Sequence, residues 1–427
     1  MMLFDAFVNE LGRSSADAWE LTERTTSGWE FYFVRHELDQ NWAIEVGELT
    51  IKVFKRSEDG QYMGNATAVL PPTTDEAEIG QAIEKLIYQA SLVKNKPYDL
   101  VGPSGNPVSA DLPDLYNVAK DYLDAMNSVQ ETKTEDINSY EIFCSNITVH
   151  FANSCGVDIV QSFPVSMAEV VVNARDAGHE IELYRMYNAG TCDGDQLRKN
   201  IQRTMEFGRD RLKAEPTPEV SGIPILLSTS DAVQVYYYFL DNLDVSYVYR
   251  HLSSFELGKE IAVSTGDRVT VRSRKELPNS SCNLQFDPEG SPVRDLVLME
   301  QGVPKAFHGS RMFSSYLGLE GSFLVQNWEV SGGSCSEEEI RQGDHLEIVE
   351  FSDFQVDPLT GDIFGEIRLG YLHQNGEVRI VTGGSVSGDL KENLSDLRMT
   401  REQVQYNNVM IPAVTRLSHV SIAGVKQ

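Results

Sequence analysis

The hydrophobic and polar positions of the first half of the chain alternate between strand-like and helix-like patterns. Aromatic and β-branched residues gather over 29–36 and 42–56, which favours two strands, and Gly47 is expected to bend or bulge the second. Apolar residues at helical spacing predict an amphipathic helix over 1–12. Further strands are predicted at 140–151, 168–174 and 180–186, the last two joined by a turn at 175–178.

Three more helices are predicted before the middle of the chain. Thr73 and Glu76 have the spacing of a capping box, and the helix that follows has a buried stripe from Ile79 to Ala90. The others are expected at about 113–126 and 195–212. Two prolines among polar residues then follow at 214–218. Such a segment is typical of a linker, so we expect domains at 1–215 and 216–427.

The second half is dominated by strand patterns. A short apolar strand is predicted at 224–228, then one or two helices between 231 and 257, and almost entirely strands beyond 261. Turn residues at 301–302, 357–362 and 375–376 predict hairpins. The expected fold class is α+β. It combines an N-terminal α/β domain, with a mixed sheet and helices, and a C-terminal, mostly antiparallel β domain with one or two helices.

Composition limits the possible partners and compartment. The 427 residues carry 36 Lys+Arg against 64 Asp+Glu, a formal charge of −28, which disfavours contact with nucleic-acid phosphates. No apolar run approaches the length of a membrane span, and the N-terminus lacks the basic region of a signal peptide. Five scattered cysteines suit a reducing compartment. We therefore expect a cytoplasmic protein.

Common catalytic signatures are absent from the sequence. It contains neither a P-loop nor a dinucleotide-binding glycine fingerprint, and it has no Gly-x-Ser-x-Gly elbow. His36 and His179 are each followed by Glu, but neither has a second His four or five residues later, and no Cys-x-x-Cys occurs. The motifs alone therefore predict no zinc site.

Three weaker candidate sites are better explained by a structural role of their residues. Cys144, His150 and Cys155 form a loose cluster, but a buried thiol and a hydrogen-bonded histidine in a sheet are favoured. Cys335 could pair with His345 or His308 as a nucleophile, yet the three glutamates at 337–339 disfavour a reactive thiolate. The aromatic run 236–239 could stack on a ligand, although a helix would place at least two of these rings in the core.

Several turn motifs, in order, resemble the TldD/PmbA family of peptidase-complex subunits. They are Phe-Asp-Pro-Glu-Gly-Ser-Pro at 286–292, Leu-Met-Glu-Gln-Gly-Val-Pro-Lys at 298–305, Val-Asp-Pro-Leu-Thr-Gly-Asp at 356–362, Gly-Tyr-Leu at 370–372 with Asn-Gly-Glu at 375–377, and Ser-Gly at 387–388. The first half agrees more loosely, at 152–157 and 182–184. The resemblance thus covers nearly the whole chain.

The resemblance also implies a division of labour between two kinds of subunit. TldD-like chains carry His-Glu-x-x-x-His on a helix after the first strand of their C-terminal half, and a cysteine ligand near the C-terminus. Here 231–242 contains neither His nor Glu, and 396–427 contains no Cys. The chain therefore resembles the TldE (PmbA) branch, which lacks the catalytic zinc and partners a metal-bearing TldD-like chain.

The function implied is that of a TldE/PmbA-like subunit of a cytoplasmic metallopeptidase that acts on unfolded peptides. We expect no catalytic residue, metal or cofactor on this chain, zinc on a TldD-like partner, and peptide contacts at Gly332, Gly333 and Ser334, where the backbone can approach closely. An alternative is a homodimeric peptide-binding or scaffold protein without peptidase activity. A third is a hydrolase with its own site at Cys335 or at Cys144 and His150. The family's older label, modulation of DNA gyrase, fits poorly with direct DNA contact by so acidic a chain.

Overall fold

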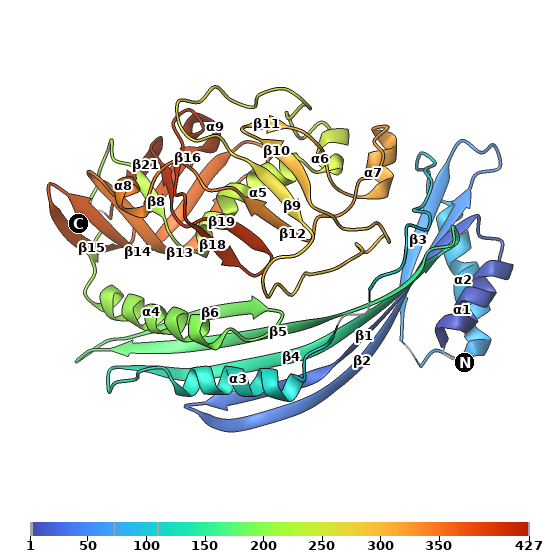
Figure 1. The fold of residues 1–427 in the computed structure, drawn as a ribbon, viewed down its shortest axis with the longest axis horizontal. Coiled ribbons are helices and arrows are strands. Elements are labelled where there is room, and N and C mark those ends of the chain that lie inside the picture. The colour runs from blue at the N-terminus through green and yellow to red at the C-terminus, as the bar shows by residue number, and fades with distance from the viewer. Residues whose placement is uncertain (1–2, 72, 109–110, 426–427) are drawn as a thin grey trace.

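The computed structural model describes residues 3–71, 73–108 and 111–425. Its N-terminal part is one long, curved sheet of six strands (Figure 1). In spatial order the strands are β3 (Met63–Leu70), β2 (Glu37–Arg56), β1 (Ala18–Val34), β4 (Glu135–Asn153), β5 (Asp158–Arg175) and β6 (Glu180–Ala189). All five pairings are antiparallel, so the expected mixed sheet is not what forms.

Four helices pack on one face of this sheet, two at each end. They are α1 (Leu3–Arg13), α2 (Glu76–Ser91), α3 (Leu115–Asn127) and α4 (Gly194–Leu212). Cys144 of β4 belongs to the core beneath α3 and α4, and Ala152 belongs to the core beneath α1 and α2. Because strand side chains alternate, these two residues lie on the same face eight positions apart. One continuous sheet therefore supports two separate clusters.

The predicted helices form, with small shifts at their ends. The helix predicted over 1–12 is α1, with residues 1 and 2 outside the described residues. Asp75, and not Thr73, caps α2, by accepting a hydrogen bond from the backbone N–H of Ala77. The bulge expected at Gly47 is absent, since Gly47 pairs regularly with Thr25, and the register of β1 and β2 shifts instead between Tyr32 and Phe33.

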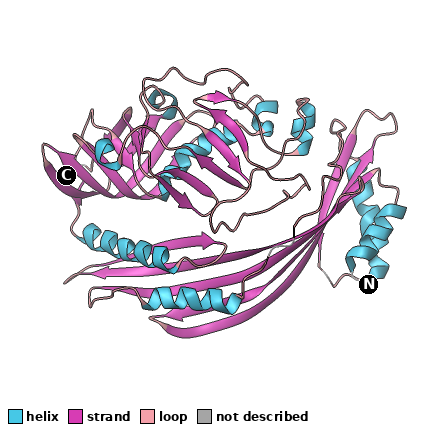
Figure 2. Ribbon diagram, in the orientation of Figure 1, coloured by secondary structure: helices cyan, strands magenta, loops and turns pink. Residues whose placement is uncertain are grey.

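The C-terminal part contains two further sheets (Figure 2). One has the order β11 (Val303–Pro304), β10 (Leu296–Glu300), β9 (Val271–Arg274), β12 (Asn327–Val330), β19 (Val409–Pro412) and β18 (Gln403–Tyr406). The other has the order β17 (Arg398–Met399), β20 (Thr415–Leu417), β8 (Ile225–Leu227), β13 (His345–Val356), β14 (Asp362–Gln374), β15 (Glu377–Thr382) and β7 (Glu215–Pro216). In addition, β16 (Ser385–Asp389) pairs with β14, and β21 (Val420–Ala423) pairs with β16. The predicted α+β class is confirmed.

Helix α5 (Val233–Asn242) forms the centre of the C-terminal core. Tyr236 and Phe239 are completely buried there, in one cluster with Trp328 of the first sheet and Ile348 of the second. After α5 comes α6 (Val245–Tyr249), as predicted, but the described residues also contain three short helices that the pattern did not indicate: α7 (Arg311–Tyr316), α8 (Glu337–Ile340) and α9 (Leu390–Asn393). The predicted hairpin at 375–376 forms, because Asn375 and Gly376 adopt the positive φ that a tight turn requires.

The two parts are joined through the motif at 286–292. The side chain of Gln161, on β5, donates to the carbonyl of Phe286 at 2.8 Å and accepts from the backbone N–H of Phe286 at 3.2 Å. The Phe286 ring packs with Phe151, Val157 and Ile159 of the N-terminal part. A buried hydrophobic cluster and the hydrogen bonds beside it therefore hold the two parts together. None of the described helices is both long and apolar enough to cross a lipid bilayer.

Gly64, on β3, and Gly80, in the middle of α2, should respond to alanine in opposite ways. A Cβ on Gly64 would overlap the backbone oxygens of Ala90 and Val93, whereas the nearest atom to a Cβ on Gly80 is the Glu10 Oε1, at 3.4 Å. Gly64→Ala should lower the free energy of unfolding by about 1–3 kcal/mol through overpacking. Gly80→Ala should raise it by about 0.5–1 kcal/mol, since glycine weakens a helix interior. Urea denaturation checks both, and equal effects of the two variants would contradict this packing.

Candidate functional site

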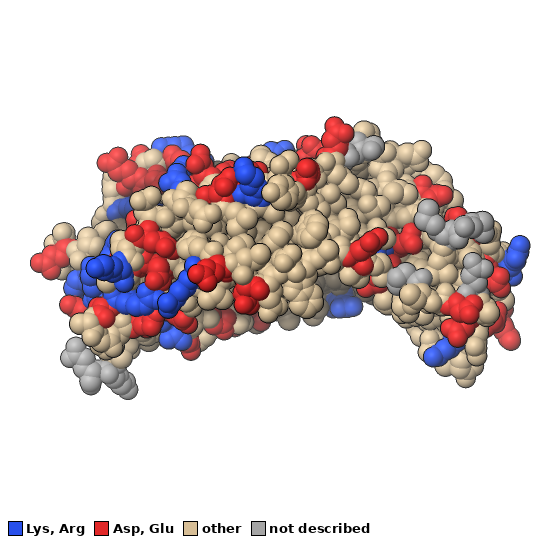
Figure 3. Space-filling view, turned by 90° about the horizontal axis from the view of Figure 1, so that it is seen from below, with Lys and Arg blue, Asp and Glu red and all other residues tan. Residues whose placement is uncertain are grey.

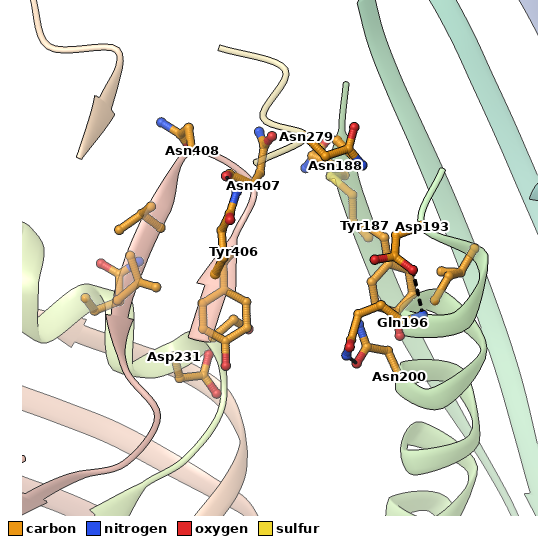
Figure 4. Close-up of a pocket in the computed structure, with 18 of the residues that line it drawn as sticks. Tyr187, Asn188, Asp193, Gln196, Asn200, Asp231, Asn279, Tyr406, Asn407 and Asn408 are labelled. Carbon is orange, nitrogen blue, oxygen red and sulfur yellow. Dashed lines mark hydrogen bonds between the residues drawn. The ribbon is translucent and has the colours of Figure 1, made fainter. Parts of the chain in front are cut away.

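A pocket of about 520 Å³ lies between the two parts of the chain. One wall is the end of β6 and the first turns of α4, and the other is the start of α5 and the turn between β18 and β19 (Figure 4). Eight lining residues are carboxamides: Asn188, Gln196, Asn200, Gln234, Asn279, Gln405, Asn407 and Asn408. We call this the carboxamide pocket.

The turn from β18 to β19 holds the C-terminal wall in a fixed shape. Asn407 has a φ of 52°, the left-handed conformation that asparagine tolerates better than most residues. Its side chain accepts from the backbone N–H of Ser281 at 2.9 Å. Asn408 donates to the carbonyl of Gln326 at 2.9 Å, and Gln405 donates to that of Pro278 at 2.7 Å. These bonds set the turn before any ligand arrives.

Asn279 connects this wall to the N-terminal part. Its Oδ1 accepts from the backbone N–H of Thr191 at 2.7 Å and from the Thr191 hydroxyl at 2.8 Å, while its Nδ2 donates to the Thr191 carbonyl. The Asn279 carbonyl also accepts from the backbone N–H of Gly190 at 2.7 Å. Four hydrogen bonds through one residue thus fix the pocket's edge.

The N-terminal wall combines bonded and free carboxamides. Asp193 caps α4 by accepting from the backbone N–H of Gln196 at 3.0 Å (Figure 4), and Gln196 donates to Asn200 at 2.9 Å. Within the described residues, the exposed side chains of Asn188 and Gln234 make no hydrogen bond. Each offers donors and an acceptor to a ligand.

Two carboxylates and several aromatic rings complete the lining. Burial raises the pKa of Asp231, an effect that the positive charge of Arg185 partly opposes. Burial also raises the pKa of Tyr406 to about 12, so its hydroxyl is protonated at neutral pH. Of the aromatic run at 236–239, Tyr237 lines the pocket and the other three rings are buried in the core, in line with the expectation that at least two would be.

The pocket residues do not suit a catalytic zinc ion. Such an ion takes three protein ligands from His, Cys or a carboxylate. The lining contains Asp193 and Asp231 but neither His nor Cys, and α5 presents Gln234 towards the pocket. Among the described residues, one group of three such side chains lies close enough for metal binding, and its members (His345, Glu347 and His373) do not line the pocket.

The three residues predicted to contact peptide lie elsewhere. Gly332, Gly333 and Ser334 follow β12, and a Cβ on Gly332 would overlap the carbonyl of Arg401. The backbone N–H of Gly333 donates to Thr400 at 2.8 Å and that of Ser334 to Asp267 at 3.0 Å. The backbone donors of Gly333 and Ser334 are thus already used inside the chain, and none of the three residues lines the carboxamide pocket. A contact with peptide stays a prediction.

The cysteines and the histidine considered as other candidate sites lie in surroundings typical of structural residues. Cys144 is fully buried and burial raises the pKa of its thiol to about 12, while His150 stacks on Phe4 and lies 2.7 Å from Asp158. Cys155 is exposed. Cys335 packs against a small apolar cluster of Leu226, Ile340 and Val414. None of these thiols lines the pocket.

The carboxamides of the pocket could not be predicted from the sequence. Asn and Gln follow no spacing rule of the kind that metal ligands or nucleophiles do, and these eight residues come from four distant stretches, near 190, 231, 279 and 407. The aromatic run at 236–239 was the one feature that pointed to this place, through Tyr237. A search for pairs of adjacent asparagines would also have found Asn407 and Asn408.

Two substitutions of Asn279 distinguish what its side-chain hydrogen bonds contribute to stability from what its backbone conformation costs. Asn279→Ala removes three hydrogen bonds and leaves alanine at a φ of 52°, so unfolding should become easier by about 2–4 kcal/mol. Asn279→Gly loses the same hydrogen bonds, but glycine adopts a positive φ without strain. It should therefore destabilise the protein by about 1 kcal/mol less than Asn279→Ala does. Urea denaturation of both variants measures the difference. Wild-type stability in either variant would show that Asn279 does not hold the two parts together.

Comparisons with known proteins show which proteins this chain is similar to. The PmbA/TldA metallopeptidase C-terminal domain matches residues 221–424. The crystal structure of TldE from Thermococcus kodakarensis superposes with a TM-score of 0.80 at 16% identity, covering 98% of this chain and 100% of that one. A candidate modulator of a DNA gyrase from Thermotoga maritima gives 0.78 at 16% identity, covering 98% and 99%. Another, from Bacteroides thetaiotaomicron, gives 0.77 at 14%, covering 99% and 98%.

A search of curated protein sequences finds no match. The solved structures share the fold along the whole chain. The resemblance predicted from the turn motifs is confirmed, since residues 221–424 match the C-terminal domain of the PmbA/TldA metallopeptidases.

Proposed function

We propose that the protein is a TldE-like subunit of a cytoplasmic TldD/TldE-type metallopeptidase and that it binds unfolded peptide without cleaving it. In this proposal a TldD-like partner carries the zinc and performs the hydrolysis. The observation that carries the proposal is the carboxamide pocket, one wall of which is the start of α5 in the family domain. It is lined by amides where a zinc enzyme needs three metal ligands.

The pocket's chemistry supports a peptide as the ligand. Each carboxamide can donate to a peptide carbonyl and accept from a peptide N–H, so it matches a backbone whatever the side chains are. Tyr187, Tyr237 and Tyr406 add apolar surface with protonated hydroxyls. β6 is also the last strand of its sheet, and its end at 186–189 lines the pocket. An extended peptide could add to that open edge.

Surface charge supports a peptide over nucleic acid. On the face shown in Figure 3, the basic side chains lie among acidic ones and the middle stretch carries few charges. Asp193 and Asp231 are the carboxylates of the pocket, whose lining contains neither Lys nor Arg. A phosphate backbone would find no cation there, whereas a neutral or basic peptide would meet no repulsion.

Reconstitution tests the proposed division of labour. The TldD-like chain that carries His-Glu-x-x-x-His in the same genome is mixed with this protein and with zinc, and hydrolysis of an unfolded, fluorescent casein-derived peptide is followed. We expect no hydrolysis by this protein alone, a stable complex on size exclusion, and at least tenfold faster hydrolysis by the complex than by the partner alone. Equal rates with and without this protein would refute the proposal. A homodimer that binds peptide but ignores the partner would favour the scaffold alternative.

Removal of a free carboxamide tests the pocket itself. Gln234→Leu keeps the helical propensity and approximate size of the side chain but removes its donors and acceptor, so the affinity for a labelled unfolded peptide should fall roughly five- to tenfold, or about 1 kcal/mol. Gln81→Leu, at an exposed position of α2, is the matched control and should bind like the wild type. Fluorescence anisotropy measures both. Unchanged affinity in Gln234→Leu would place the peptide outside the pocket.

A further inference from the structure

Three side chains of metal-binding type meet on one face of β13 and β14. His345 lies directly opposite His373 in the antiparallel register, and Glu347 follows two positions later on the same face of β13. One ligand atom of each residue lies within 4.8 Å of the other two. None of the three lines the carboxamide pocket.

His345 has the protonation state of a metal ligand. The residue is completely buried, and its Nδ1 lies 2.9 Å from the carbonyl oxygen of Gly343. A carbonyl can only accept, so Nδ1 carries the proton and Nε2 keeps a lone pair. That Nε2 is buried and has no hydrogen-bond partner among the described residues. A backbone carbonyl that orients a histidine in this way is common at metal sites.

Glu347 is oriented by an arginine and retains capacity for a cation. Arg341 donates to its two oxygens at 3.0 and 3.1 Å, and also to Glu337 at 2.9 Å. Each carboxylate oxygen has a second lone pair that these bonds leave unused. Arg416 also lies close enough for its charge to act on His345, so the two arginines and two carboxylates sum to zero. Glu347 places the negative charge nearest to the two imidazoles.

His373 lies on the side from which an ion could reach the three side chains. Its ring stacks on that of His345, with centroids 4.3 Å apart and planes inclined by 15°, and the residue is half-buried. A ring nitrogen points its lone pair within the ring plane, so both histidines can bind one ion only if His373 turns out of the stack. Its χ2 torsion is soft and its outer side faces solvent, which permits that rotation.

We propose that His345, Glu347 and His373 bind one divalent transition-metal ion of the zinc class. Two imidazoles and one carboxylate suit Zn²⁺, while Mg²⁺ and Ca²⁺ prefer sites built from oxygen ligands. The ion would satisfy the lone pair of His345 and tie the start of β13 to the end of β14. Because the three residues lie outside the carboxamide pocket, the ion takes no part in the proposed peptide binding. The site departs from the sequence-based expectation that this chain binds no metal.

Titration of the full-length, tag-free chain tests the site. After treatment with a chelator, the protein is titrated with Zn²⁺ by calorimetry, and with Co²⁺ by visible absorption. We expect one equivalent of each to bind, Zn²⁺ to raise the Tm, and Mg²⁺ at millimolar concentration not to compete. His373→Ala should weaken Zn²⁺ binding at least tenfold and abolish the rise in Tm. It removes a half-buried ring and leaves buried His345 in place, so the variant should fold.

His179→Ala is the matched control, since that histidine is 82% exposed on a distant turn and should not affect binding. Failure of the wild type to bind Zn²⁺ below 100 μM would overturn the proposal, as would equal affinity in His373→Ala or equal competition by Mg²⁺. These results do not depend on a partner or on peptide, so the site can fail while the proposed peptidase role stands, and the reverse is also possible.

Discussion

The hydrogen-bonded joint between the two parts of the chain is the constraint on which the pocket depends. The walls of the carboxamide pocket belong to different sheets, so their spacing is set where those sheets meet. Asn279 fixes one side of the joint through Thr191, and Gln161 fixes the other through the backbone of Phe286. Because each amide both donates and accepts, neither contact leaves a buried polar group unpaired, and neither requires a charge to be buried.

The motif at 286–292, one of those that carry the family resemblance, helps to build this joint. Asp287 accepts hydrogen bonds from the backbone N–H groups of Glu289, Ser291 and Leu324, and burial nevertheless raises the pKa of its carboxyl to about 6. Gly290 has a φ of 81°, and a Cβ there would lie 2.7 Å from the Phe151 ring. The turn can therefore neither carry a side chain at that position nor move away. A sequence pattern that such packing requires identifies a fold and says little about an active site.

The sequence predicted local structure better than long-range structure. Helices, strands and the turn at 375–376 follow from spacing within about twenty residues, and these were largely confirmed. The pairing of β1 with β4 and the pocket depend on contacts between residues over a hundred positions apart, for which a single sequence has no pattern. The pairing of His345 with His373 lies between these two cases, because only part of it could be predicted. The predicted hairpin brings them near, but three register shifts along β13 and β14 decide which face each side chain occupies.

The location of histidines in this chain also bears on the proposed division of labour. At the start of α5 the lining combines Asp231 with amide and tyrosine side chains, which can hold a peptide but do not supply the ligand set of a metal ion that polarises a carbonyl and activates water. The pair of histidines with a nearby carboxylate is instead built into β13 and β14, where His345 is sealed from solvent and Glu347 is held by Arg341. These three side chains do not line the carboxamide pocket, so an ion held by them would not contact a peptide bound there. In the proposed complex the metal for hydrolysis therefore comes from the partner, beside a peptide that this chain helps to hold.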